Sequence, residues 1–514
     1  MLQPHQFDCR APVYDRLGVH SIINCGGVRT FYGNSIVSDA VLGAMASAAG
    51  RYVLIEELAE AIGARIAQCT GAEWGIVTAG SAAALALASA ACMAGNDPER
   101  MLRLPRTEGM RNVALVPGGH RFAYDHAIRS AGCRIVEIET REEAEHALKQ
   151  ENVALISVLA GRELGPSLGL EELASIVAPF RVPILVDAAS EFLETPNPWI
   201  ARGADLVVYS VSKYMRGPPA TGLLIGKERL VRAAWLNGAP HQAFGRTMKV
   251  GKEQMVGALV ALETWLERDA AADRQAWLAR LSVIAGSVGH LSGVACETLT
   301  GPGRVPTLRV SWASEGAPLS TDVLRADLLA GQPRVLIDDI GATANSVMID
   351  PFGLSDREAV IVGDALANRL RAQRVESPPN ADATAIGGEW TVSIEFSNAA
   401  RAHCFRLEQD GRKLRGTHVL SFATTTIEGE VDGPDVLLQS FHRLEGSIVR
   451  FRFSGKVGAD GTMNGLVTMG HAAEHTQGPV AFGQFGAARW SATKAEPVLG
   501  QSPQGSYCSM SKGP

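Results

Sequence analysis

Between residues 20 and 375, short apolar runs alternate with longer Ala- and Leu-rich stretches, and this rhythm constrains the fold more than any other feature of the chain. Most positions within a run are apolar, as is typical of strands buried on both faces of a parallel sheet. The stretches between the runs have helical composition, which suits the crossover connections that parallel strands need. The runs are WGIVT at 74–78, NVALVP at 112–117, RIVEI at 134–138, NVALISVL at 152–159, PILVD at 183–187 and DLVVYS at 205–210. We therefore expect an α/β domain with a mostly parallel sheet.

Changes in composition divide the chain further. A length of 514 residues suggests about three domains at roughly 150 residues each. Residues 1–265 carry the α/β rhythm and form the predicted large domain. Residues 266–376 contain a helix around Trp277, three short strands and a last helix that Ser355 caps, which predicts a small α+β domain. The predicted strands of this small domain are 307–312, 334–340 and 346–351.

The C-terminal part of the chain has the pattern of an antiparallel β structure. Residues 377–388 are rich in Pro, Ala and Gly and form a predicted linker. Residues 389–494 consist of short alternating segments, with Asp-Gly hairpin signals at 410–411, 432–433 and 460–461. We expect an up-and-down barrel or a sandwich, and the opening GGEW resembles that of lipocalin- or avidin-like barrels. Residues 495–514 form a predicted disordered tail.

The overall composition argues against several classes of protein. The 48 Lys and Arg against 54 Asp and Glu give a net charge of −6, so no basic field favours nucleic acid or a membrane surface. The longest small-apolar run, at 82–94, is shorter than the roughly 20 residues of a membrane span. The N-terminus carries no signal-peptide pattern, and the 8 cysteines include no CxxC pair. We expect a soluble, cytoplasmic protein without a disulfide framework.

A pair of histidines invites a metal interpretation that the rest of the sequence does not support. His471 and His475 are four residues apart, a spacing at which two side chains on a helix can bind one metal ion. No third ligand lies nearby, and the segment falls in the β-rich region. We therefore predict no metal site.

Lys213 is the first candidate for chemistry. It follows the apolar run at 205–210 directly and precedes a Gly- and Pro-rich loop. A lysine at the end of a buried strand is partly desolvated, which lowers its pKa and makes the amine nucleophilic, as a Schiff-base lysine requires. The alternative is a lysine in an exposed loop.

Two other elements precede Lys213 in the chain. Asp187 ends the run PILVD, where a side chain points into the ligand crevice of an α/β sheet and can pair with the pyridinium nitrogen of pyridoxal phosphate. Gly80 and Ser81 stand between an apolar run and an Ala-rich helix, so that free backbone N–H groups and the helix dipole face a phosphate. The alternatives are an aspartate that caps the next helix and an ordinary helix start.

The order of these motifs resembles the fold-type I pyridoxal-phosphate enzymes. Within them, INCGGVRTFYGNSIVSDAVLGAM at 23–45, the block at 52–88 and GRTMKVGKEQMVGALVALE at 245–263 are similar to the bacterial selenocysteine synthase-like branch, which includes glucosaminate-phosphate ammonia-lyases. The resemblance covers about residues 13–370. It implies a homodimer or larger homo-oligomer. It does not extend to an N-terminal tRNA-binding domain, so tRNA is not the expected substrate.

The resemblance implies roles for individual residues. Lys213 would bind pyridoxal 5'-phosphate covalently, Asp187 would contact the pyridine nitrogen, and the phosphate would be held by Gly80, Ser81, Ala82 and Ser210. His120, in VPGGH, would stack on the pyridine face, although an ordinary loop histidine is the alternative. Arg246 and Lys249, which form a basic cluster with Lys252, would meet the carboxylate or phosphate of the substrate, in their own or a partner subunit; a solvated helix face is the alternative.

The activity that the resemblance implies is elimination. Lys213 would take the α-proton of a small hydroxylated or phosphorylated amino acid, the β-hydroxyl would leave, and hydrolysis would release ammonia. Replacement of the β-group by sulfur or selenium, racemisation and retro-aldol cleavage are the enzymatic alternatives. A non-enzymatic carrier, in which the barrel is the working part, is disfavoured because Lys213 and Asp187 are both present.

Overall fold

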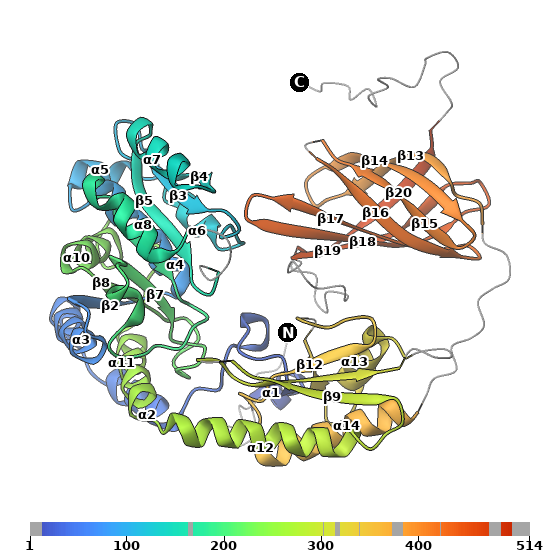
Figure 1. Cartoon of the computed structure of the whole chain (residues 1–514), viewed down its shortest axis with the longest axis horizontal. Helices are drawn as coiled ribbons and strands as arrows, with labels where there is room; N and C mark the ends of the chain where they lie inside the picture. Colours follow the sequence, from blue (N-terminus) through green and yellow to red (C-terminus); the bar gives the residue numbers. More distant parts are fainter. Residues whose placement is uncertain are drawn as a thin grey trace, which may run out of the picture. The chain divides into compact units, whose positions relative to one another are not determined.

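The computed structural model describes residues 13–162, 168–301, 303–313, 319–338, 340–372, 384–421, 423–471 and 485–495. The chain forms two compact units, and Figure 1 shows an α/β unit and a β-barrel. The α/β unit is formed by residues within 1–373, apart from 315–318 and 339–344. The finer predicted boundaries, including the division at residue 265, stay predictions.

The α/β unit is built on a seven-stranded sheet with the order β2-β8-β7-β6-β5-β3-β4. Each apolar run named above forms one of its strands, which confirms the predicted α/β class. Only β8 is antiparallel to its neighbours, and the remaining pairs are parallel. The strands are β2 (Trp74–Thr78), β3 (Val113–Pro117), β4 (Arg134–Ile138), β5 (Val153–Leu159), β6 (Ile184–Asp187), β7 (Leu206–Ser210) and β8 (Gly222–Gly226).

Helices bury both faces of this sheet. Alternate strand residues point to opposite sides, so Leu155 and Ile156 belong to two different hydrophobic clusters. One cluster includes α4, α6 and α10, and the other includes α2, α3, α7, α8 and α11. The helices are α1 (Val13–Arg16), α2 (Asp39–Ala49), α3 (Ile55–Thr70), α4 (Ser81–Ala94), α5 (Pro98–Arg103), α6 (Asp125–Ser130), α7 (Arg141–Gln150), α8 (Leu170–Val177), α9 (Pro198–Ala201), α10 (Glu228–Asn237) and α11 (Lys252–Glu267).

The predicted small α+β region has a three-stranded antiparallel sheet of order β12-β10-β9. Trp277 lies in a helix as predicted, and Ser355 caps the last helix through a capping box with Glu358. The strand β9 was not predicted because its sequence, VACETL, does not alternate regularly between apolar and polar residues. The predicted strand 334–340 is wrong in extent, since only Val335–Leu336 pair, in parallel with β1 (Ile23–Asn24). The elements are α12 (Ala270–Val288), β9 (Val294–Leu299), β10 (Thr307–Trp312), α13 (Thr321–Ala330), β11 (Val335–Leu336), β12 (Ser346–Ile349) and α14 (Asp356–Arg371).

The C-terminal unit is a closed barrel of eight antiparallel strands, each paired with its neighbour in sequence, which settles the prediction in favour of a barrel. All three Asp-Gly pairs lie at hairpins, and each of these glycines has a positive φ. Trp390, Phe405, Phe453 and Trp490 pack inside. The strands are β13 (Gly388–Glu395), β14 (Ala400–Asp410), β15 (Lys413–Val419), β16 (Thr424–Asp432), β17 (Asp435–Leu444), β18 (Ser447–Val457), β19 (Met463–His471) and β20 (Ala487–Lys494).

Some sequence predictions fall on other parts of the chain. Residues 377–383 of the predicted linker, His475 and the tail from 496 lie outside the described residues. His471 ends strand β19. Among the described helices, none is both long and apolar enough to cross a membrane.

Candidate active site

A pocket of about 500 Å³ lies at the carboxyl ends of the central strands of the α/β unit. Because β2, β7, β6 and β5 run in the same direction, the residues that follow them meet at one edge of the sheet. Gly80, Ser81 and Ala82 follow β2, Ser210 to Lys213 follow or end β7, and Asp187 ends β6. The structure therefore brings these sequence-predicted residues together in one cavity.

Lys213 occupies the turn after β7. Its Nζ donates a hydrogen bond to Oγ of Ser190, over 2.7 Å. Burial lowers the pKa of the Lys213 amine, while the negative charges of Asp187 and Glu191 act in the opposite direction. The desolvation that the sequence predicted for this lysine is present.

Asp187 is a buried residue that lines the pocket. It is only 5% exposed, and its Oδ1 accepts a hydrogen bond from the backbone N–H of Ala189, over 3.0 Å. Burial raises the pKa of the carboxyl group, and the Ala189 hydrogen bond and the charge of Lys213 lower it. The alternative role as a helix cap is wrong, because Asn197 caps α9, the next helix.

The start of α4 offers the pocket unpaired backbone donors. The first N–H groups of a helix have no acceptor within it, and at α4 these belong to Ser81 and the residues after it. Gly80 precedes the helix with a φ of +91°, and a Cβ on Gly222 of β8 would lie 2.6 Å from the Gly80 backbone. Two glycines thus let the turn pack directly on the sheet. Ser210 adds its Oγ, 3.1 Å from Oγ of Ser212.

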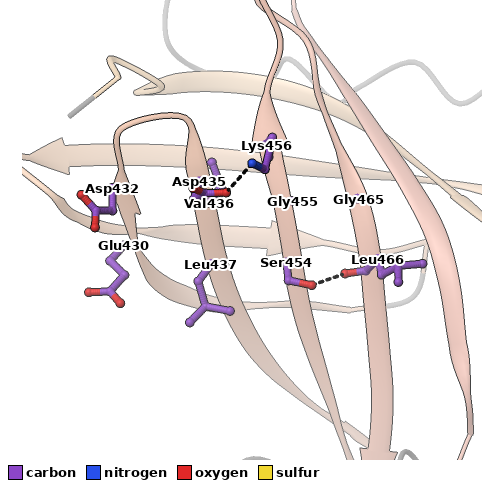
Figure 2. Close-up of a pocket in the computed structure, with 10 residues that line it drawn as sticks. All are labelled: Glu430, Asp432, Asp435, Val436, Leu437, Ser454, Gly455, Lys456, Gly465 and Leu466. Atoms are coloured by element: carbon purple, nitrogen blue, oxygen red, sulfur yellow. Dashed lines mark hydrogen bonds and ion pairs between the residues drawn. The ribbon is translucent and has the colours of Figure 1, made fainter. Parts of the chain in front are cut away.

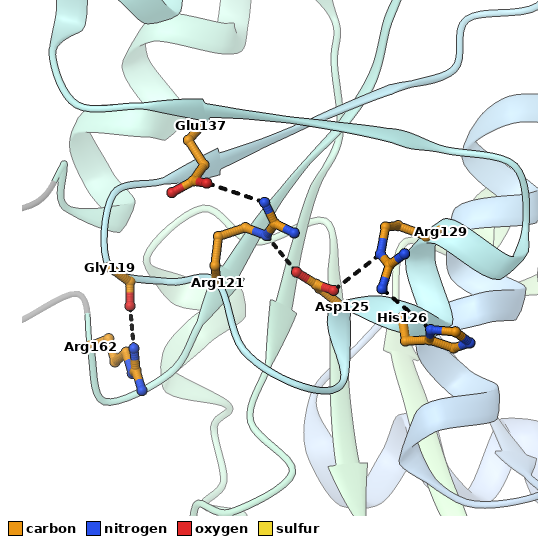
Figure 3. A network of polar contacts seen from close by, with 7 residues as sticks. All are labelled: Gly119, Arg121, Asp125, His126, Arg129, Glu137 and Arg162. Atoms are coloured by element: carbon orange, nitrogen blue, oxygen red, sulfur yellow. Dashed lines mark hydrogen bonds and ion pairs between the residues drawn. The ribbon is translucent and has the colours of Figure 1, made fainter. Parts of the chain in front are cut away.

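The loop between β3 and α6 is held by a charged network, which Figure 3 shows. The buried Asp125 accepts hydrogen bonds from Arg121 at 2.5 Å and from Arg129 at 3.3 Å. Arg121 also reaches Glu137, over 3.1 Å. The loop held in this way contributes two aromatic side chains, Phe122 and Tyr124, to the pocket lining.

His120 lies in the same loop but away from the pocket lining. The residue is 2% exposed, and its Nδ1 accepts a hydrogen bond from the backbone N–H of Leu159, over 3.1 Å. This contact ties the loop after β3 to the end of β5. The stacking role of His120 stays a prediction.

Arg246 and Lys249 are exposed and do not line this pocket. The interpretation of the basic cluster as one helix face is wrong, because α11 begins only at Lys252, after the N-cap Gly251. Nζ of Lys252 donates to the carbonyls of Ala48 and Ala49 at the end of α2. A substrate role for Arg246 and Lys249 stays a prediction that requires the pocket of another subunit.

Several pocket residues were not predicted. Phe122 and Tyr124 stand two and four residues after His120, so the loop was identified but not its side chains. Ser190 and Glu191 follow the strand end at Asp187, which is the signal that could have found them. Two further lining residues, Arg162 and Arg304, come from a loop after β5 and from the turn between β9 and β10. No local sequence signal marks Arg304.

Comparison with known proteins gives this arrangement its context. No protein-family model matches the chain. The D-glucosaminate-6-phosphate ammonia lyase of Salmonella typhimurium is 34% identical over 263 residues, which are 49% of this chain and 70% of that protein. The 5'-C-glycyluridine monooxygenase-decarboxylase of a Streptomyces species is 32% identical over 367 residues, 68% of this chain and 90% of that protein. The chain belongs to the family of these two proteins.

More distant matches extend this family. The L-seryl-tRNA(Sec) selenium transferase of Moorella thermoacetica is 26% identical over 297 residues, 52% of this chain and 60% of its own. A solved structure of D-glucosaminate-6-phosphate ammonia-lyase superposes with a TM-score of 0.62 and 28% identity, over 70% of this chain and 99% of that one. The α/β unit has the fold-type I architecture that the sequence predicted. About 30% of the chain lies outside that structural match.

Proposed function

We propose that the protein is a pyridoxal 5'-phosphate-dependent lyase that removes ammonia from a small hydroxylated or phosphorylated amino acid. The observation that carries this proposal is the pocket in which Lys213, Asp187 and the start of α4 meet. The similarity to an ammonia lyase that acts on a phosphorylated amino sugar acid supports the reaction type and the substrate class.

The pocket has the donor set that this cofactor needs. The backbone N–H groups at Ser81 and Ala82 would hold its phosphate, because Gly80 and Gly222 leave this helix start open. Ser210 would add a hydroxyl contact. The buried carboxylate of Asp187 would pair with the pyridine nitrogen. When bound, the cofactor supplies an electron sink for the negative charge that develops at the substrate α-carbon.

Lys213 has the properties of both the covalent anchor and the base. Burial lowers the pKa of its amine, so a larger fraction of Nζ is unprotonated and able to accept the α-proton. Ser190 holds Nζ at the pocket wall. Loss of the α-proton to Nζ and of the β-hydroxyl as water, followed by addition of water, converts the amino acid into a 2-oxo acid and ammonia.

A second candidate function is oxygen-dependent decarboxylation of an amino acid. It is favoured by the match to the monooxygenase-decarboxylase, which covers 90% of that protein. The two reactions differ in their small products, since elimination releases ammonia without consuming O2, and oxidative decarboxylation consumes O2 and releases CO2.

Assays of ammonia, O2 and CO2 with a panel of D- and L-hydroxy amino acids and their phosphate esters test the proposal. We expect ammonia release from at least one compound, no O2 uptake, and a fall of roughly 10²–10⁴-fold or more in Lys213→Ala. The exposed Lys149→Ala on α7 is the matched control and should retain full activity. O2 uptake with CO2 release would replace elimination by the second candidate, and a fully active Lys213→Ala would contradict both.

Size and assembly belong to the same proposal. The exposed positions of Arg246 and Lys249 suit a homodimer or larger homo-oligomer in which these side chains face the pocket of a neighbouring subunit. One chain has a mass of 54.4 kDa. Sedimentation of the purified protein should then give at least twice this mass.

A further inference from the structure

The turn between β9 and β10 contributes a cationic side chain, Arg304, to the pocket, and the reaction proposed above does not use it. Arg304 lines the same cavity as Lys213. Its Nη2 lies 3.6 Å from Oε1 of Glu191, and the arginine side chain is 63% exposed. The guanidinium is therefore accessible to a dissolved ligand, while the Glu191 side chain that faces it is only 20% exposed.

Gly161, which follows β5, leaves the space that this pair occupies. A Cβ on Gly161 would lie 2.9 Å from Nη2 of Arg304 and 3.1 Å from Oε1 of Glu191. The backbone there has a φ of +82°, which side chains rarely adopt. The glycine thus permits an arginine from the β9–β10 turn and a glutamate from the β6 end to meet over the wall of the pocket.

This cation is separate from the helix start that is assigned to the cofactor phosphate. Gly80 and Ser81 follow β2, and Gly161 follows β5, with β8, β7 and β6 between them in the sheet. The pocket therefore has an anion-binding group at each end. An arginine fork matches the geometry of a carboxylate or a phosphate, so the second end suits an acidic group of the substrate.

We propose that Arg304 is a specificity-determining residue that binds an acidic group of the amino acid substrate, a carboxylate or a phosphate, and that Glu191 competes with this group for the guanidinium. The inference rests on the proposed function, because it requires an amino acid beside Lys213. Glu191 then sets a threshold: a ligand has to displace the carboxylate that faces Arg304 before it can bind.

The test measures binding rather than turnover. The cofactor-loaded protein is titrated with serine, O-phosphoserine and phosphoethanolamine, and dissociation constants are read from the cofactor absorption and from calorimetry. Serine carries only the carboxylate, phosphoethanolamine only the phosphate, and O-phosphoserine both. We expect Arg304→Ala to weaken the compounds that carry the recognised group roughly tenfold or more, since a hydrogen bond to a charged group is lost.

The pattern across the probes identifies the group. Weakened serine and O-phosphoserine with unchanged phosphoethanolamine assign Arg304 to the carboxylate, and weakened O-phosphoserine and phosphoethanolamine with unchanged serine assign it to the phosphate. Arg304→Lys should recover part of the affinity. Glu191→Gln should tighten binding of the same compounds severalfold.

The matched control is Arg309→Ala, because Arg309 lies on the same hairpin and pairs with Glu297 outside the pocket. It should bind all three probes as the unmodified protein does. Equal affinities in Arg304→Ala and the unmodified protein would overturn the inference while leaving the proposed function intact. Weaker binding in Glu191→Gln would overturn the competition. A loaded protein that binds none of the probes would count against the inference and against the amino acid substrate together.

Discussion

Both units of the molecule bury ionisable side chains, but they do so in different ways. In the α/β unit, Lys213 and Asp187 carry opposite charges and line a cavity that small molecules can enter. In the barrel, His403, His418 and His442 bond to one another and to Ser440 inside the strand wall. Shifted pKa values are found in both places, but Lys213 and Asp187 also line one cavity, and each acts on the pKa of the other, which is the pattern expected of a functional site.

The barrel also has a pocket of its own, and the three histidines do not line it. Figure 2 shows it on strands β16 to β19, where Lys456 pairs with Asp435 over 3.5 Å and Glu430 and Asp432 line the pocket from β16. Its volume of about 450 Å³ is close to that of the active-site pocket. Volume alone therefore does not separate a catalytic cavity from a surface groove, whereas the groups that converge in it do.

The histidine cluster gives the prediction with the largest expected effect. Burial lowers the pKa of His403 and of His442 to about 4 and that of His418 to about 2. Since the folded barrel favours the neutral form, its stability is complete above the ordinary histidine pKa of about 6.5 and is lost as the pH falls through 6.5 toward 4. We expect a loss of several kcal/mol by pH 4.

Hydrogen exchange of peptides from β14, β15 and β17 in the full chain checks this loss. Exchange should accelerate between pH 6.5 and 4 beyond the intrinsic chemical trend, and less so in His403→Phe. If protection from hydrogen exchange stayed constant between pH 6.5 and 4, the three histidines would tolerate protonation in the folded barrel. The difference drawn between the two units would then be wrong.

A second prediction concerns the charge of the active-site carboxylate. Asp187→Asn preserves shape but removes the charge that would pair with the cofactor nitrogen, a charge-assisted hydrogen bond of about 1.5–3 kcal/mol. We expect turnover to fall roughly 10- to 150-fold. Steady-state kinetics on the cofactor-loaded variant provides the measurement, and Asp205→Asn, beside the surface Lys227, is the control. Equal losses in both variants would mean that the effect is structural.

A third prediction concerns the turn before α4. A Cβ on Gly222 would meet the Gly80 and Ser81 backbone, so Gly222→Ala should push the helix start out of position at a cost of about 1–3 kcal/mol. Absorbance titration with the cofactor should show a dissociation constant raised by one to two orders of magnitude. Gly286→Ala on α12, which has open space around its Cβ position, should bind the cofactor normally. Unchanged affinity in Gly222→Ala would remove this turn from the cofactor site.

The smallest expected effect is at the loop of Figure 3. Asp125→Asn removes the negative charge that holds Arg121 and Arg129. The loop should then hold Phe122 and Tyr124 less firmly in the pocket lining. We expect a severalfold rise in KM and little change in kcat, because no group of the network touches the reacting atoms. A fall in kcat at constant KM would contradict a role limited to positioning.

Sequence reasoning found what local patterns encode and missed what tertiary approach creates. Asp187 was identifiable because it ends an apolar run, and Lys213 because it stands three residues after the end of another; a strand end in such a sheet faces the crevice. Arg304 approaches Glu191 because two turns that are distant in the sequence meet beside Gly161. The residues next to Arg304 in the sequence do not signal this contact. The spacing of Arg246, Lys249 and Lys252 suggested a helix face, although the helix begins only at the last of them.

The central claim is that Lys213 is the residue that binds pyridoxal 5'-phosphate covalently in the pocket at the carboxyl ends of the sheet. It is tested most directly by reconstituting the purified protein with the cofactor, reducing it with borohydride and locating the modified residue by peptide mass spectrometry. The account predicts one stoichiometric modification on Lys213, which disappears in Lys213→Ala. Modification of another lysine, such as Lys227 or Lys252, or the absence of any reduced adduct, would contradict it.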